Sequence, residues 1–151
     1  MEQHEERISS FFRFEDLRVY DKATSYATWL VGVLKGIDGT DPLKSAFCHS
    51  AFDIAINIAE GSSRTKSQFE HCLKVAKTAV RECVVYTEVA SNSGMLDEMQ
   101  KEQSRENLME LTRMLGALII SLERSSERRS QAPAEEPAEE ADPYASDGMS
   151  Y

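Results

Sequence analysis

The sequence predicts an all-α fold in the form of an antiparallel, up-down bundle of four helices. Apolar residues recur with the helical period over four successive segments, and no stretch sustains the two-residue alternation of a strand. Most glycines that precede residue 131 fall at the ends of these segments. With 151 residues, of which 41% are apolar, the chain is long enough for one domain with a hydrophobic core.

The first helix is expected from about Glu15 to Leu34. One apolar stripe follows the helical period and packs into the bundle; it consists of Leu17, Tyr20, Ala23, Ala27, Leu30 and Leu34. A second stripe repeats every seven residues and consists of Val19, Tyr26 and Val33. Because one stripe is enough to pack a bundle, the second predicts a contact surface between copies of the chain.

The second helix is expected to begin with Asp41 as its N-cap and Pro42 in its first position, and to end at Gly61. Residues 51–59, AFDIAINIA, are apolar at all but two positions. A helix that is apolar nearly all round must be buried nearly all round, and one four-helix chain offers too little cover. The predicted oligomer interface therefore also includes Phe52 and Ile56.

The third helix is expected to begin with a capping box of Ser67 and Glu70 and to end at Ser93-Gly94. The fourth covers about Leu96 to Arg124, with a near-heptad seam formed by Leu108, Leu111, Leu115, Leu118 and Leu122. The connections between the helices are short, which favours antiparallel neighbours.

The chain divides into an N-terminal extension (1–13), the four-helix bundle (14–125) and a disordered acidic tail (126–151). Residues 131–151 hold three of the four prolines, six acidic residues and no Lys or Arg. They have too few apolar side chains to offset the conformational entropy that folding would cost. The whole chain carries a net charge of −9, but the remainder has 17 basic against 20 acidic residues, a net charge of −3. Charge-driven capture by nucleic acid or by an anionic membrane is therefore disfavoured.

A polar cluster interrupts the end of the second helix, in the sequence NIAEGSSR (residues 57–64). Glu60 places a negative charge beside a helix C-terminus, and Asn57 needs hydrogen-bond partners in an apolar stretch. We expect Arg64 to pair with Glu60 and Asn57 to hold the loop backbone, so that with Gly61 they form a polar lock. The alternative is a phosphate site on the same rim, with donors from Ser62, Ser63, Arg64 and Lys66.

Two motifs connect the chain to a known family. The sequences FEDLRVY (14–20) and NIAEGSSR (57–64), followed by Phe69, Leu73, Ala76 and Glu82, resemble bacterial four-helix-bundle proteins first noticed in intervening sequences of large-subunit ribosomal RNA genes. The resemblance spans about residues 12–124 and extends to the accessory variability determinant of diversity-generating retroelements. It implies a pentameric barrel that binds a reverse transcriptase and nucleic acid.

A basic stripe on the third helix is a second candidate site. It consists of Lys74, Lys77 and Arg81, and it is extended at the rim by Arg64 and Lys66. Such cations contact nucleic-acid phosphates without reading bases. Glutamates on the same helix balance the charges, so a solvated face of mixed charge is the alternative.

We expect no metal, cofactor or catalytic site, and thus no enzyme. Cys48-His49 and His71-Cys72 offer zinc-type ligands, but in a hairpin of the second and third helices they lie about 12 Å apart along the axis. No nucleophile–base set is suggested. The N-terminus lacks the features of a signal peptide and no apolar run reaches about 18 residues, so we expect a cytoplasmic protein with no membrane contact.

The sequence therefore predicts a non-catalytic, oligomeric scaffold or accessory protein. It is expected to form a homo-oligomeric ring, pentameric by resemblance, and to present surfaces to a protein or ribonucleoprotein partner such as a reverse transcriptase. The alternative is an RNA- or DNA-binding module that uses the basic stripe and the rim between the second and third helices.

Overall fold

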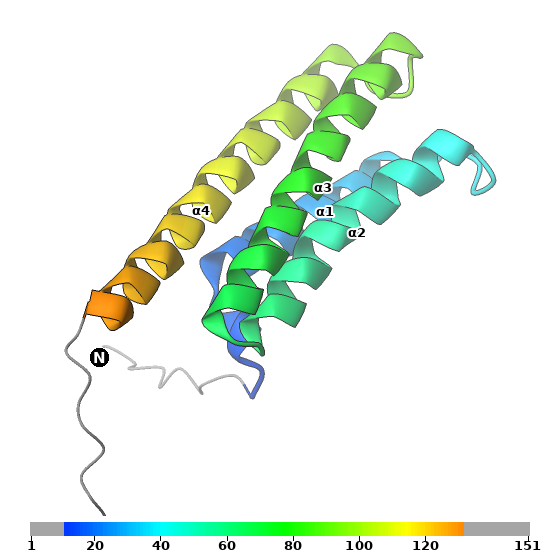
Figure 1. The fold of residues 1–151 in the computed structure, drawn as a ribbon. Helices are drawn as coiled ribbons and strands as arrows, with labels where there is room; N and C mark the ends of the chain where they lie inside the picture. The colour runs from blue at the N-terminus through cyan, green and yellow to red at the C-terminus, as the bar shows by residue number, and fades with distance from the viewer. Residues whose placement is uncertain (1–10, 132–151) are drawn as a thin grey trace, which may run out of the picture.

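The computed structural model describes residues 11–131, which contain four α helices and no strand (Figure 1). A short 3-10 helix, η1 (Arg13–Asp16), comes first and is followed by α1 (Arg18–Val33), α2 (Pro42–Ser62), α3 (Lys66–Asn92) and α4 (Glu98–Gln131). The prediction of an all-α fold with four helices is confirmed.

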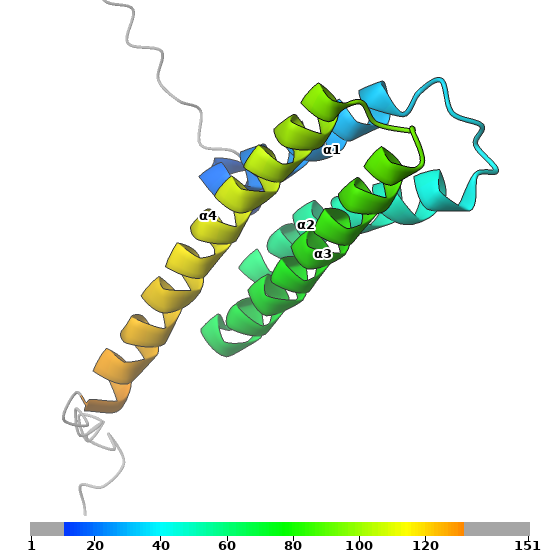
Figure 2. The same ribbon diagram turned by 90° about the horizontal axis from the view of Figure 1, so that it is seen from above.

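The helices differ greatly in length. α4 has 34 residues and α1 has 16, which correspond to about 51 Å and about 24 Å. Lys22 of α1 pairs with Glu110, and Tyr26 bonds to Ser104, so α1 lies along the first half of α4. Towards its C-terminus α4 projects beyond α1, as the two views of the ribbon show (Figures 1 and 2).

A capping side chain explains where α2 begins, whereas α1 begins after a residue of extended backbone. Asp41 caps α2 as predicted, because its side chain accepts hydrogen bonds from the backbone N–H groups of Leu43 (2.9 Å) and Lys44 (3.2 Å). The expected start of the first helix at Glu15 is wrong. The backbone is extended at Leu17 (φ −80°, ψ 124°), which separates η1 from α1.

The predicted capping box of Ser67 and Glu70 is also wrong, because α3 begins at Lys66 and Thr65 is its N-cap. The Gln68 N–H donates to Thr65 Oγ1 (3.3 Å), and the Thr65 N–H donates to the Gln68 side-chain carbonyl (3.4 Å). The sequence contains two overlapping boxes of the same spacing, and the upstream one is used.

Gly61 serves close packing and does not end α2, so its predicted role as the residue after the helix is wrong. α2 continues to Ser62, and Gly61 is buried. A Cβ atom at Gly61 would lie 2.7 Å from Cys72 Cβ and 2.8 Å from the Phe69 ring, both on α3. The missing side chain therefore lets α2 and α3 approach one another. A left-handed backbone occurs instead at Gly94 (φ 80°), where the end of the third helix was correctly expected.

The hydrophobic core lies between the four helices and takes residues from each of them. Its largest fully buried side chains include Tyr26, Leu30, Leu34, Phe47, Ile54, Ile58, Leu73, Leu108, Leu111 and Leu115. The predicted leucine seam of α4 is thus confirmed for its first three members. Leu118 and Leu122 are only partly buried, although Ile119 between them is buried.

α4 is longer than the sequence suggested. It continues to Gln131, beyond the expected end at Arg124, so residues 126–131, which were assigned to the acidic tail, are helical. The rest of the predicted tail and most of the predicted N-terminal extension, residues 132–151 and 1–10, lie outside the described residues.

A chain of hydroxyl groups crosses the core and joins three helices. Tyr26 of α1 lies 2.8 Å from Ser104 of α4, and Ser104 lies 2.8 Å from Thr87 of α3. Thr87 donates to the carbonyl of Cys83 at 2.7 Å. Because each hydroxyl has one proton, this last bond sets the direction of the others: Ser104 donates to Thr87, and Tyr26 donates to Ser104.

Candidate functional site

An apolar groove of about 470 Å³ runs between α1 and α2 and is the first candidate site. This α1–α2 groove is lined by Thr24, Ala27, Thr28, Val31, Phe52, Ala55 and Ile56. Val31 is 44% exposed, Phe52 41% and Ile56 58%. The hydroxyl of Thr24 already donates to carbonyls of its own helix, so it needs no hydrogen-bond acceptor from a molecule in the groove. An apolar groove of this kind is typical of a surface that another molecule covers.

Of the five residues predicted to form an oligomer interface, Phe52 and Ile56 line this groove. Val19 and Tyr26 are buried within the chain itself, and Val33 is partly buried against its core. The prediction of a second, outward stripe on the first helix is therefore wrong. α1 packs against both α2 and α4, and a helix between two neighbours buries two stripes.

The apolar surface continues towards the N-terminal end of the described chain. A second hollow of about 490 Å³ shares Ile56 with the α1–α2 groove and is bordered by Phe11, Phe12 and Phe14. Phe11 is 91% exposed, and its ring packs edge-on against Phe12 with the centroids 5.0 Å apart. The other residues that line this hollow are Ala59 and the polar Arg13, Glu60, Ser62 and Ser63, so its apolar part lies between Ile56 of α2 and the phenylalanines before and in η1.

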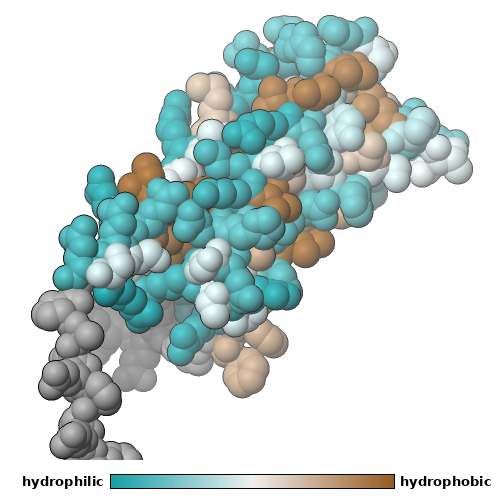
Figure 3. Space-filling model, viewed as in Figure 1, coloured by the Kyte–Doolittle hydropathy of each residue, from teal (hydrophilic) through white to brown (hydrophobic). Residues whose placement is uncertain are grey.

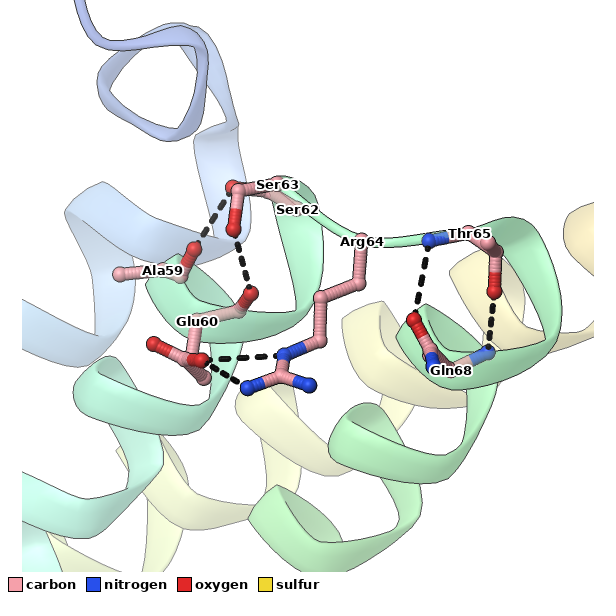
Figure 4. A network of polar contacts seen from close by, with 7 residues as sticks. All are labelled: Ala59, Glu60, Ser62, Ser63, Arg64, Thr65 and Gln68. Carbon is pink, nitrogen blue, oxygen red and sulfur yellow. Dashed lines mark hydrogen bonds and ion pairs between the residues drawn. The ribbon is translucent and has the colours of Figure 1, made fainter.

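The predicted polar lock at the turn between α2 and α3 forms in part (Figure 4). Arg64 Nε donates to Glu60 Oε1 at 3.0 Å, and a second guanidinium nitrogen contacts the same oxygen. This hydrogen bond and the charge of Glu60 raise the pKa of Arg64, although both side chains are about half exposed. The predicted role of Asn57 is wrong, because its amide donates to the carbonyl of Asp53 within α2 (2.8 Å) and not to the loop.

Most predicted donors on this rim already have partners in the protein. Ser62 and Ser63 donate to the carbonyls of Ala59 (2.8 Å) and Glu60 (3.0 Å), which the end of α2 leaves open (Figure 4). Lys66 donates to a serine of α4. A phosphate at this rim would have to compete with these bonds.

The basic stripe on α3 combines paired and unpaired cations. Lys74 contacts Glu70 at 2.9 Å and lies 3.8 Å from Glu123, and the hydrogen bond and charge of Glu70 raise the pKa of Lys74. Lys77 is partly buried and Arg81 is exposed; within residues 11–131 neither forms an ion pair. The face formed by α2, α3 and α4 is mostly hydrophilic with hydrophobic patches (Figure 3).

The thiols and histidines of residues 11–131 lie on α2 and α3. Burial raises the pKa of Cys83 and of Cys48, so these thiols stay protonated at neutral pH and are poor ligands or nucleophiles. His49 lies 3.4 Å from Asp53. Across residues 11–131, no group of three His, Cys, Asp or Glu side chains is placed to hold a metal ion. None of the helices in that range is long and apolar enough to cross a bilayer.

Sequence reasoning missed a cluster of polar and basic side chains at the end of α4. A hollow of about 540 Å³ is lined there by Ser121, Arg124, Ser125, Arg128 and Arg129. Because the fourth helix was expected to end at Arg124, the residues after it were not placed on a helix. A longer helix would have placed four of these residues, at spacings of three and four, on one side.

Comparison with known proteins identifies the family. The model of the 23S rRNA-intervening sequence protein family matches residues 15–117, which is more than half of the chain. The fold is similar to that of a protein of unknown function from the S23 ribosomal protein family of Bacteroides thetaiotaomicron, with a TM-score of 0.63 and 20% identity over 67% of this chain and 94% of that one. No curated protein matches the chain. The protein therefore belongs to the 23S rRNA-intervening sequence protein family.

Proposed function

We propose that the protein is a non-catalytic, oligomeric accessory protein. Its helices form an antiparallel up-down bundle, and copies assemble into a ring through the α1–α2 groove. The ring presents its remaining surfaces to a protein or ribonucleoprotein partner in the cytoplasm. The resemblance to retroelement accessory proteins favours a pentamer, with a reverse transcriptase as partner.

The exposed apolar lining of the α1–α2 groove carries this proposal. Fully burying a Val, Ile or Phe side chain contributes about 1.5–3 kcal/mol, and Val31, Phe52 and Ile56 are each roughly half exposed, so covering them contributes about 1 kcal/mol each. Association costs more than this, but the neighbouring hollow, which shares Ile56, adds the exposed rings of Phe11 and Phe12. Covering Phe11 and Phe12 together with the groove would bury further apolar surface.

Two further observations support the antiparallel bundle. Ser50 Oγ of α2 donates to Glu82 of α3 at 2.7 Å, while Gly61 lies against Cys72, so residue numbers rise along one helix as they fall along the other. For the ring, the α1–α2 groove would have to meet a different surface of the next copy, which makes a heterologous interface. Such an interface closes into a ring when the rotation between copies closes, and forms an open filament when it does not.

The second candidate function is RNA or DNA binding by the basic stripe and the rim. Lys77 and Arg81 favour it, since neither has an ion-pair partner among residues 11–131. Arg64 and Lys74 weigh against it because each is paired with a glutamate. Affinity for phosphates falls steeply with salt, so nucleic acid that elutes with the protein only at low salt would favour this alternative.

The experiment is the native mass of two matched variants, measured by light scattering coupled to size-exclusion chromatography. Ile56→Glu places a charge in the α1–α2 groove, and Met109→Glu places one at a comparably exposed apolar residue of α4 (58% and 52% exposed). We expect Ile56→Glu to dissociate the oligomer and Met109→Glu to leave its mass unchanged. An unchanged mass for Ile56→Glu, or equal dissociation of both, would rule out the groove as the interface.

A further inference from the structure

The last turns of α4 carry a basic face without an acidic partner among residues 11–131. Ser121, Arg124, Ser125 and Arg128 share one side of the helix, and Arg129 completes the lining of their hollow. None of the three arginines forms an ion pair within the described part of the chain. We call Arg124, Arg128 and Arg129 the arginine face.

Neighbouring charges do not neutralise this face. Lys66 of α3 donates a hydrogen bond to Ser125 and so adds a further cation beside the hollow. Two glutamates lie in the same turns of α4. Glu123 lies 3.8 Å from Lys74, and within residues 11–131 Glu127 forms no ion pair with an arginine of the face. The face therefore keeps a positive potential that an acidic segment would complement.

The chain itself supplies such a segment directly after α4. Residues 132–151 contain six acidic residues and no Lys or Arg, so they carry −6 of the total net charge of −9. Four of the acids form the pairs Glu135-Glu136 and Glu139-Glu140. The pairs are four residues apart, as are Arg124 and Arg128. Both charge patterns lie beyond residue 117, where the match to the family model ends.

The distances along the chain allow the two segments to meet. Arg128 and Arg124 lie about 4.5 Å and about 10 Å back along the helix from Gln131, at 1.5 Å per residue. Glu135 to Glu140 follow Gln131 by roughly 13–30 Å of extended chain. Pro133 disfavours a continued helix at this point, so a reversal of chain direction there costs no helical hydrogen bonds.

We propose that residues 135–142 of this chain's own acidic tail bind the arginine face and cover the basic end of α4. The tail then occupies the positive surface that another polyanion would need. A nucleic acid approaching this end of the bundle must displace the tail, which makes the tail an intramolecular competitor for phosphate groups.

The test compares the backbone amide chemical shifts of the tail in full-length proteins by NMR. One variant carries Arg124→Gln, Arg128→Gln and Arg129→Gln, and the control carries Arg105→Gln and Arg113→Gln at exposed positions of the same helix. In the wild type we expect the shifts of residues 135–142 to change between about 0.05 M and about 0.5 M salt, because screening weakens the contact. The triple variant should show the high-salt shifts already at low salt, and the control should behave as the wild type.

Tail shifts at low salt that are identical in the wild type and the triple variant would overturn the proposal. So would a control that changes them as much as the triple variant does. Binding of a fluorescent oligodeoxythymidylate to the wild type at low salt, lost in the triple variant while the tail shifts stay unchanged, would assign the arginine face to nucleic acid instead. Far-ultraviolet circular dichroism of each variant checks that the helices remain.

Discussion

The hydroxyl chain through the core makes a directional prediction about stability. Tyr26 donates to Ser104, Ser104 donates to Thr87, and Thr87 donates to the Cys83 carbonyl. Removing the Tyr26 hydroxyl, the first donor, should therefore cost less stability than removing the Ser104 hydroxyl in the middle of the chain. Tyr26→Phe leaves no orphaned donor and should lower the free energy of unfolding by about 1 kcal/mol. Ser104→Ala leaves the Tyr26 hydroxyl buried without an acceptor and should cost about 2–3 kcal/mol.

The double variant decides whether the two groups act as one unit. With Phe at position 26, the hydroxyl that Ser104→Ala would orphan no longer exists, so the second substitution should cost little more. We expect the double variant to be no less stable than Ser104→Ala alone, well short of the sum of about 3–4 kcal/mol that independent sites would give. Urea titrations followed by circular dichroism at one fixed protein concentration provide the free energies.

A matched cycle uses Tyr86→Phe with Ser104→Ala, because Tyr86 is a partly buried tyrosine of α3 outside the hydroxyl chain. These two changes should add within about 0.5 kcal/mol. Additive effects of Tyr26→Phe and Ser104→Ala would refute the inferred direction of the hydrogen bonds.

Three shorter predictions concern packing, titration and the rim. Gly61→Ala should lower the free energy of unfolding by about 1–3 kcal/mol, because the added methyl group overlaps α3. Gly116→Ala has open space around it and should raise the free energy of unfolding by up to about 1 kcal/mol. Equal effects of the two substitutions in urea titrations would contradict the close approach of α2 and α3. Burial raises the pKa of Cys83, so the unfolded chain releases this proton first and stability should fall as the pH rises above about 8.5. Cys83→Ala should flatten that slope in titrations at several pH values, and an unchanged slope would place the titration elsewhere. Arg64→Ala should leave the melting temperature in calorimetry unchanged within error, because the exposed pair with Glu60 contributes little; a clear drop would show that the lock stabilises the fold.

Local signals in the sequence were enough to predict the four helices. Asp41 followed by proline marks one helix start without ambiguity, and the structure confirms it. The start of α3 was ambiguous, because Thr65-x-x-Gln68 and Ser67-x-x-Glu70 fit the same capping pattern. To choose between them, one must know where α2 ends. The predicted end of α2 in turn depends on whether Gly61 ends the helix or permits close packing. A glycine that permits close packing looks the same in sequence as one that ends a helix.

The candidate sites were harder to predict because they depend on contacts between distant residues. The seven-residue repeat of Val19 and Tyr26 indicated an apolar stripe correctly, but the sequence does not say whether α4 or another copy covers it. Ser104 lies among charged residues of α4, so nothing local marks it as the partner of Tyr26. The Glu60–Arg64 pair was predictable since the two residues are only four positions apart at the end of a helix.

The most direct test of self-assembly is the native mass of the full-length wild type over a range of concentrations, with the absorbance of nucleic acid recorded beside that of protein. We expect one discrete species well above the chain mass of 17.0 kDa, about 85 kDa for five copies, and no nucleic acid. A species of 17.0 kDa at every concentration would contradict assembly through the α1–α2 groove.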